Sequence, residues 1–239
     1  MDRLLKEEQQ LFAHESDIYN QMRKIAGKLN TRIIEPIVRL KVIDGKSGRI
    51  KLFRERHSHS YVRNMFVSTT LAVPFTPVGS TYADGDMVWK DTDGSVSGAT
   101  SNLQDIDPET VGSGYFGAAS GDHHGVLVGR DATAEDFDDD FVLGNLVTDG
   151  TGPNQMEYLL TSKAEAWVGG SSYYSSTWTR GFDNVPAAPA TITIFEVGLV
   201  YIPASALNIM HARDIDAGGV AVPNGDRLIV EYEIRTSFP

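Results

Sequence analysis

Hydrophobic positions recur at two different periods along the chain, and the change of period separates a helical beginning from a β-rich remainder. In residues 1–30 one stripe of positions is spaced 4-3-4-3-4-3-4, which is a heptad seam about four heptads long. The seam consists of Leu4, Glu8, Leu11, Glu15, Ile18, Met22, Ile25 and Leu29. This pattern predicts an amphipathic helix, and Pro36 predicts its end.

The seam allows two interpretations of this helix, and both remain open. The helix could pack on its own domain, or it could pack on copies of itself or on a neighbouring protein. Two of the eight seam positions are glutamates, which weaken an isolated coiled coil but suit the groove of a different protein. Under the second interpretation, the predicted assembly interface consists of Leu4, Leu11, Ile18, Met22, Ile25 and Leu29.

The last strand-like segment of the chain shows strong alternation with a period of two. Leu228, Val230, Tyr232 and Ile234 fall on one face, and charged residues fill most of the other. A half-buried strand must pair with something or leave an open sheet edge. The apolar segment 191–202 is expected to be a central strand covered on both sides, and we expect it to be the partner.

Between these two segments the chain alternates strand signals with turn signals. The pattern predicts a β-hairpin around "DGKSG" in residues 37–56 and a short helix in residues 58–73. It predicts several more strands in residues 125–239. Residues 78–124 are rich in Gly, Ser, Thr and Asp, and we interpret them as a long excursion from the core with one or two small strands. The expected fold is mainly β, an antiparallel β-sandwich of jelly-roll-like type. We divide it into a helical assembly segment, 1–35, and a sandwich domain, 36–239.

The composition of the chain argues against several classes of function. The 239 residues carry a formal net charge of −11 and no cysteine, which argues against a nucleic-acid binder and excludes disulfides and cysteine-ligated zinc. No apolar run approaches the length of a membrane span, and the first 30 residues lack the apolar core of a signal peptide. We therefore expect synthesis in a cytoplasm and no membrane partner. The predicted hairpin 37–56 carries the one basic patch, which is either a solvated face or a docking site for an acidic neighbour.

Candidate chemistry is sparse, and no recognisable catalytic constellation is present. The histidines of "GDHHG" and "RHSHS" are better explained as loop or cap residues than as metal ligands, and the acidic fragments lack the full calcium-loop pattern. These candidates are Asp122, His123, His124, His57, His59, Asp84, Asp86, Asp91, Asp93 and the run 135–140. We expect no catalytic residue, no metal and no cofactor.

Aromatic residues gather around the predicted hairpin at "GGSS". They are Trp167, Tyr173, Tyr174 and Trp178. A sugar-binding platform would place such rings on the surface beside carboxylates, whereas a two-layer sandwich uses large aromatics in its core, which is the commoner reason for them.

The order of segments in the C-terminal half resembles virion structural proteins of tailed bacteriophages and related prokaryotic viruses. It runs "DDFVLGNLVTDGTGPNQMEY", "RGFDN", "ITIFEVGLVYI", "MHARDI" and "VAVPNGDRLIVEYEIRTSF", with "SHSYVRNMF" earlier. The resemblance covers roughly 37–73 and 125–239 and is one of pattern and order, not of a catalytic signature.

The resemblance implies a non-enzymatic, β-rich component that is built into the virion in many copies. Its partners would be itself and other virion proteins, and its preferred role is a capsid decoration or head-surface component. The alternative is a tail or fibre adhesin that binds a host surface glycan. The adhesin predicts exposed Tyr and Trp beside carboxylates, and the decoration role predicts those rings in the core.

Overall fold

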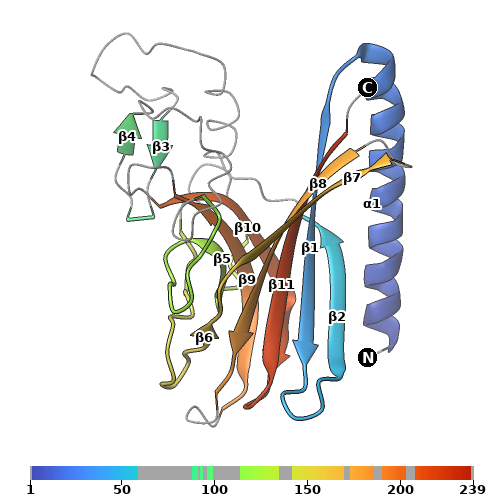
Figure 1. The fold of residues 1–239 in the computed structure, drawn as a ribbon. Helices are drawn as coiled ribbons and strands as arrows, with labels where there is room; N and C mark the ends of the chain where they lie inside the picture. The colour runs from blue at the N-terminus through green and yellow to red at the C-terminus, as the bar shows by residue number, and fades with distance from the viewer. Residues whose placement is uncertain are drawn as a thin grey trace.

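The computed structural model describes residues 2–58, 88–90, 92–93, 96–98, 114–134, 142–169, 173–185, 190–202 and 208–237. One long helix precedes a series of mainly antiparallel strands (Figure 1). The elements are α1 (Asp2–Leu29), β1 (Ile33–Ile43), β2 (Ile50–His57), β3 (Val88–Lys90), β4 (Val96–Gly98), β5 (Gly125–Gly129), β6 (Glu157–Tyr158), β7 (Ser162–Val168), β8 (Tyr173–Asp183), β9 (Ile192–Tyr201), β10 (Ile209–Val222) and β11 (Arg227–Ser237).

The strands form two facing sheets, which confirms the predicted antiparallel β-sandwich with an N-terminal helix. The larger sheet has the order β2-β1-β11-β8, and β6 and β7 both pair with β8. The smaller sheet has the order β10-β9-β5, and β3 and β4 form a separate two-stranded pair. The short helix predicted within 58–73 falls almost entirely outside the described residues.

The terminal strand β11 lies inside the larger sheet, but its partners differ from the expected one. It pairs along its full length with β1 on one side and β8 on the other. The expected partner, segment 191–202, forms β9, which is the central strand of the opposite sheet. Alternation reveals which face of a strand is buried but carries no information about its neighbours, and this is why the pairing was wrong.

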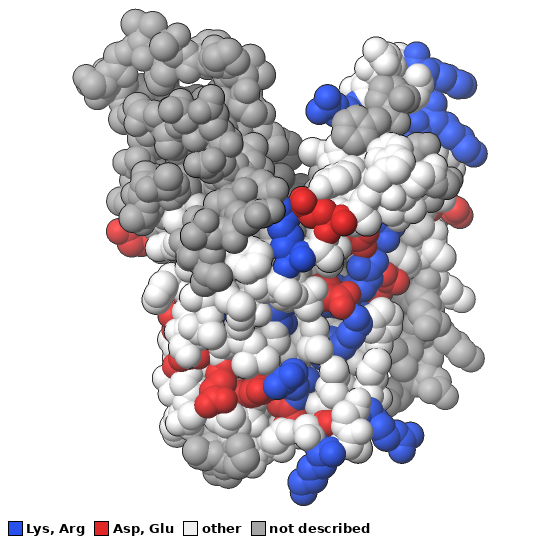
Figure 2. Space-filling model, in the orientation of Figure 1, with Lys and Arg blue, Asp and Glu red and all other residues white. Residues whose placement is uncertain are grey.

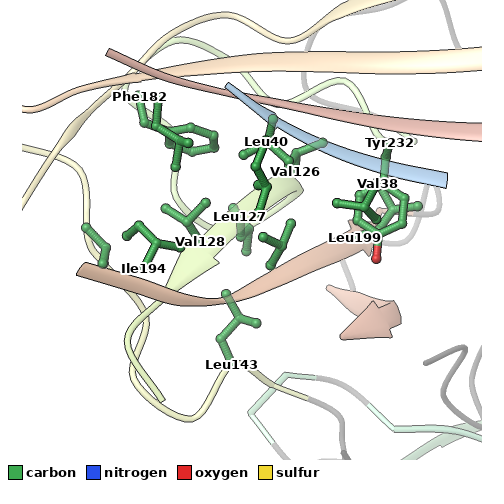
Figure 3. Packing of buried hydrophobic residues seen from close by; sticks show 14 of the residues in the cluster. Val38, Leu40, Val126, Leu127, Val128, Leu143, Phe182, Ile194, Leu199 and Tyr232 are labelled. Carbon is green, nitrogen blue, oxygen red and sulfur yellow. The ribbon is translucent and has the colours of Figure 1, made fainter. Parts of the chain in front are cut away.

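The core fills the space between the sheets with apolar side chains from both (Figure 3). Leu228, Val230 and Tyr232 of β11 are fully buried, as their alternation predicted. Eight of the ten residues of β9 are buried, in agreement with a central strand covered on both sides. Other core side chains are Val38, Leu40 and Val42 from β1, Phe182 from β8, and Val126, Leu127 and Val128 from β5.

A buried arginine ties the end of the excursion to the sandwich. Arg180 of β8 has no exposed surface, and its guanidinium donates to the backbone carbonyls of His124, Val126, Ala118, Gly121 and Leu159 at 2.5–3.1 Å. Burial lowers the pKa of Arg180 to about 10, so it stays charged at neutral pH. The last part of the excursion therefore belongs to the core, which also takes in the side chain of Tyr115.

The helix ends at Leu29, which agrees with the helical pattern over residues 1–30 and lies before Pro36. Asn30 adopts a left-handed conformation (φ 51°), and the amide of Thr31 donates to the carbonyl of Ala26 at 3.0 Å, which is a common way to close a helix after its last residue. Pro36 instead lies within β1, one residue beyond the point where β2 stops pairing with it.

Candidate assembly interface

Helix α1 lies along the β2–β1 end of the larger sheet, on the face turned away from the core (Figure 1). The side chains that meet the sheet recur at intervals of three and four residues, so they share one face of the helix. They are Phe12, Glu15, Tyr19, Arg23 and Ala26. Packing on its own domain is therefore shown for this face of α1.

The centre of this contact is His57, whose side chain is fully buried. Its ring is stacked between Phe12 and Tyr19, with ring centroids 4.8 and 4.7 Å apart. Its Nδ1 lies 3.1 Å from a carboxylate oxygen of Glu15, and its Nε2 lies 2.9 Å from Glu35. The imidazole ring therefore lies between two carboxylates, one from the helix and one from strand β1.

Ionic contacts extend this clamp, by which we mean His57 with Phe12, Glu15, Tyr19 and Glu35. Arg23 of α1 forms an ion pair with Glu35 of β1, and Glu35 is almost fully buried. Burial alone would raise the pKa of Glu35, but the hydrogen bonds from His57 and Arg23 outweigh it and hold this pKa below its ordinary value. The helix is thus held to the sheet by aromatic stacking and buried charge rather than by its aliphatic side chains.

The four described aliphatic positions of the predicted seam are exposed on the helix surface instead. Ile18, Met22, Ile25 and Leu29 are 44%, 43%, 56% and 70% exposed. They are the described apolar members of the predicted interface, whereas the side chains of Leu4 and Leu11 lie outside what the structure describes. Glu15, a seam position, turns instead to His57. The structure therefore brings together four predicted interface residues as an aliphatic stripe on the surface, which we call the α1 stripe.

Basic residues border the α1 stripe at its C-terminal end. Lys24, Lys28 and Arg32 are exposed there, and Figure 2 shows blue side chains gathered where α1 ends. Elsewhere on the visible face, blue and red side chains are interspersed. In a chain with a net charge of −11, a basic border around an apolar stripe favours an acidic neighbour.

The basic residues of the hairpin 37–56 mostly contact carboxylates of their own chain. Arg39 pairs with Glu55 and Glu233 at 2.5 and 2.6 Å, and Lys41 pairs with Glu231 at 2.5 Å. Further pairs join Lys51 to Asp44 and Asp226, and Arg54 to Asp216. Neither a freely solvated face nor an acidic neighbour is needed to explain this patch, because carboxylates of the same chain match these charges.

The candidate metal ligands do not converge in the described part of the chain. His123 is exposed and lies 3.0 Å from Asp122, whereas His124 is buried and faces the carbonyl of Phe116 at 3.3 Å. Among the described residues, no group of three or more His, Cys, Asp or Glu is placed to hold a metal ion. His59, Asp84, Asp86, Asp91 and the acidic run 135–140 lie outside the described residues.

The aromatic hairpin divides between core and surface. The pairing of β7 with β8 confirms the hairpin, and Trp178 is buried with its ring edge-on to Tyr115. Trp167 and Tyr174 remain 57% and 36% exposed, and Glu165 lies beside them. Tyr173 is half-buried next to Arg235. These rings therefore fit neither a purely structural nor a purely surface interpretation.

The clamp at His57 is the feature that reasoning from the sequence missed. The sequence patterns point to His57 only as a metal ligand or cap residue. A signal for the clamp lies in Phe12 and Tyr19, which share a helical face beside the seam and flank the seam position Glu15. Comparisons of the chain with protein-family models, with curated proteins and with solved structures gave no match. No helix in the described residues has the length and apolar character to cross a membrane.

Proposed function

We propose that this chain is a non-enzymatic structural protein that is incorporated in multiple copies into the particle of a tailed phage or related virus. The preferred role is a capsid decoration or head-surface component. The observation that carries the proposal is the exposed α1 stripe, on a helix that the His57 clamp holds against the sandwich. An exposed aliphatic row at heptad spacing is the kind of surface that another protein covers.

The size of the stripe supports a many-copy assembly over an isolated dimer. Ile18 to Leu29 span about 17 Å along the helix. The four side chains are already about half covered, so covering the remainder contributes on the order of 4 kcal/mol. Such a gain is small against the entropic cost of association, and a single contact would be weak. Repetition around a particle turns weak contacts into stable attachment, because each later contact forms at high effective concentration.

The proposed partners are further copies of this chain and other virion proteins. The basic border of Lys24 and Lys28 favours an acidic surface, and this chain is itself acidic. The sequence resemblance described above supports the virion as the location.

The proposal is tested by replacing the stripe without disturbing the clamp. The test variant carries Ile18→Gln and Ile25→Gln. The control carries His14→Gln and Asp17→Glu, which lie at exposed positions of the same helix outside the α1 stripe, the clamp and the basic border, and which leave the formal net charge unchanged. Tagged variants are produced during infection, and their recovery in gradient-purified particles is compared with that of the wild type. We expect the control to be incorporated and the stripe variant to be lost, with equal thermal stability of both. Normal incorporation of the stripe variant would refute the proposal.

A further inference from the structure

The exposed end of the β7–β8 hairpin carries an aromatic row that the assembly proposal does not use. Trp167 lies directly opposite Tyr174, Tyr174 opposite Thr236, and Thr236 opposite Ile34, so the four share one face of the sheet. Trp167, Tyr174 and Ile34 are exposed, the last at 42%. We call these four residues the aromatic row.

Polar groups lie beside this row. On the neighbouring pair of positions, the Ser176 hydroxyl donates to a carboxylate oxygen of Glu165 at 3.1 Å. Lys163 lies 2.9 Å from the same oxygen, and the Tyr174 side chain also hydrogen-bonds to Glu165. The hydrogen bond from Lys163 is the main reason that the pKa of Glu165 lies below its ordinary value, so the carboxylate is ionised at neutral pH. The carboxylate is therefore held in a fixed position next to the exposed rings.

This combination differs in kind from the aliphatic α1 stripe. Faces of Trp and Tyr rings are electron-rich and attract the slightly positive C–H groups that one side of a sugar ring presents, and a fixed carboxylate accepts hydrogen bonds from hydroxyl groups. Side chains directly opposite on paired strands are about 5 Å apart, which is close to the spacing of consecutive sugar rings. A nucleic acid would also stack on the rings, but it needs a basic groove, and here the row adjoins Glu165 in a chain of net charge −11.

We propose that the aromatic row and Glu165 form a binding site for a neutral oligosaccharide. Trp167 and Tyr174 supply the stacking surface, and Glu165 accepts hydrogen bonds from sugar hydroxyls. The site is independent of the α1 stripe, because the stripe lies on the helix that packs against the other face of the sheet. The assembly proposal therefore neither requires nor excludes the sugar site.

The test uses the full-length protein and four neutral tetrasaccharides: maltotetraose, cellotetraose, chitotetraose and mannotetraose. Binding is measured by titration calorimetry and by the change in tryptophan fluorescence. We expect at least one tetrasaccharide to bind, and Trp167→Ala to weaken that binding about tenfold or more. Glu165→Gln should weaken it as well. Phe53→Ala removes another exposed ring, on β2, and should leave the binding unchanged.

Absence of binding by the wild-type protein at millimolar concentrations of all four tetrasaccharides would overturn the proposal. Equal binding by wild type and Trp167→Ala would overturn it too. If Trp167→Ala binds every tetrasaccharide as the wild type does but is lost from particles, the aromatic row is a protein contact and the proposed sugar site is wrong. That last outcome would leave the α1 stripe standing, because the stripe variant is scored separately.

Discussion

Replacing His57 with alanine should release helix α1 from the sandwich while leaving the sandwich folded. The substitution removes the ring stacked between Phe12 and Tyr19, together with both hydrogen bonds to Glu15 and Glu35. The effect should be confined to α1, because the described contacts of His57 lie between the helix and the neighbouring strands.

The size of the effect follows from the burial of the charges. Removing a hydrogen-bonding partner of a buried charge, here the carboxylate of Glu35, costs about 3–5 kcal/mol, because the charge stays buried with one partner fewer. Glu35 keeps Arg23, so the lower end of this range applies. Each 1.4 kcal/mol is a factor of ten in an equilibrium constant, and opening of the helix should become about a hundredfold more frequent. Most of the stability of a helix in a protein comes from its tertiary packing, so we expect the detached α1 to lose helical structure.

Hydrogen exchange followed by mass spectrometry separates the helix from the sheet. Peptides from α1 should exchange about a hundredfold faster in His57→Ala than in wild type, and peptides from β11 should not change. His123→Ala, at an exposed histidine, is the matched control and should behave as wild type. Unchanged protection of α1 in His57→Ala would show that the clamp does not hold the helix.

Two further predictions concern the core. Tyr232→Ala should lower the free energy of unfolding by about 3–5 kcal/mol, because Tyr232 is fully buried. Glu231→Gln, on the charged face of the same strand, should lower it by about 1 kcal/mol. Thermal or denaturant unfolding measures both values, and equal losses would refute the assignment of faces. Burial lowers the pKa of His211 from its ordinary value of 6.5 to about 3, so the unfolded state binds one more proton between these pH values. The contribution of His211 to the free energy of unfolding should therefore be fully present above pH 6.5 and should fall by up to about 1.4 kcal/mol per pH unit as the pH drops. His211→Phe should flatten this pH dependence. Parallel slopes for the wild type and His211→Phe would refute a lowered pKa for His211.

The hydrophobic pattern predicted the elements better than it predicted their neighbours. Alternation placed Leu228, Val230 and Tyr232 in the core, and the apolar run at 191–202 is a central strand. It could not reveal that β11 pairs with β1, nearly 200 residues earlier, and with β8, much closer in the sequence, because the pairing of strands that are not adjacent in the chain depends on the whole fold. The helical period over residues 1–30 matches α1, but its closure through the backbone conformation of Asn30, rather than through Pro36, is visible only in the structure.

For the candidate interface, too, the sequence predicted the element but not what it packs against. The heptad spacing of Ile18, Met22, Ile25 and Leu29 was visible in the sequence, and so were Phe12 and Tyr19 beside it. Neighbouring stripes on one helix differ by a modest rotation, so the sequence cannot decide which stripe meets the sheet. The structure decides in favour of the aromatic stripe, because His57 and Glu35 supply a buried polar partner for it. The basic residues of the hairpin 37–56 likewise found partners, such as Glu231 and Asp216, that lie far away in sequence.

The most direct test of the central claim is a reconstruction of the intact particle that carries this chain. The account predicts several symmetry-related copies per particle, in which Ile18, Met22, Ile25 and Leu29 are covered by a neighbouring protein and the His57 clamp is preserved. Particles in which α1 faces solvent at every copy, or purified particles that lack the chain, would contradict it.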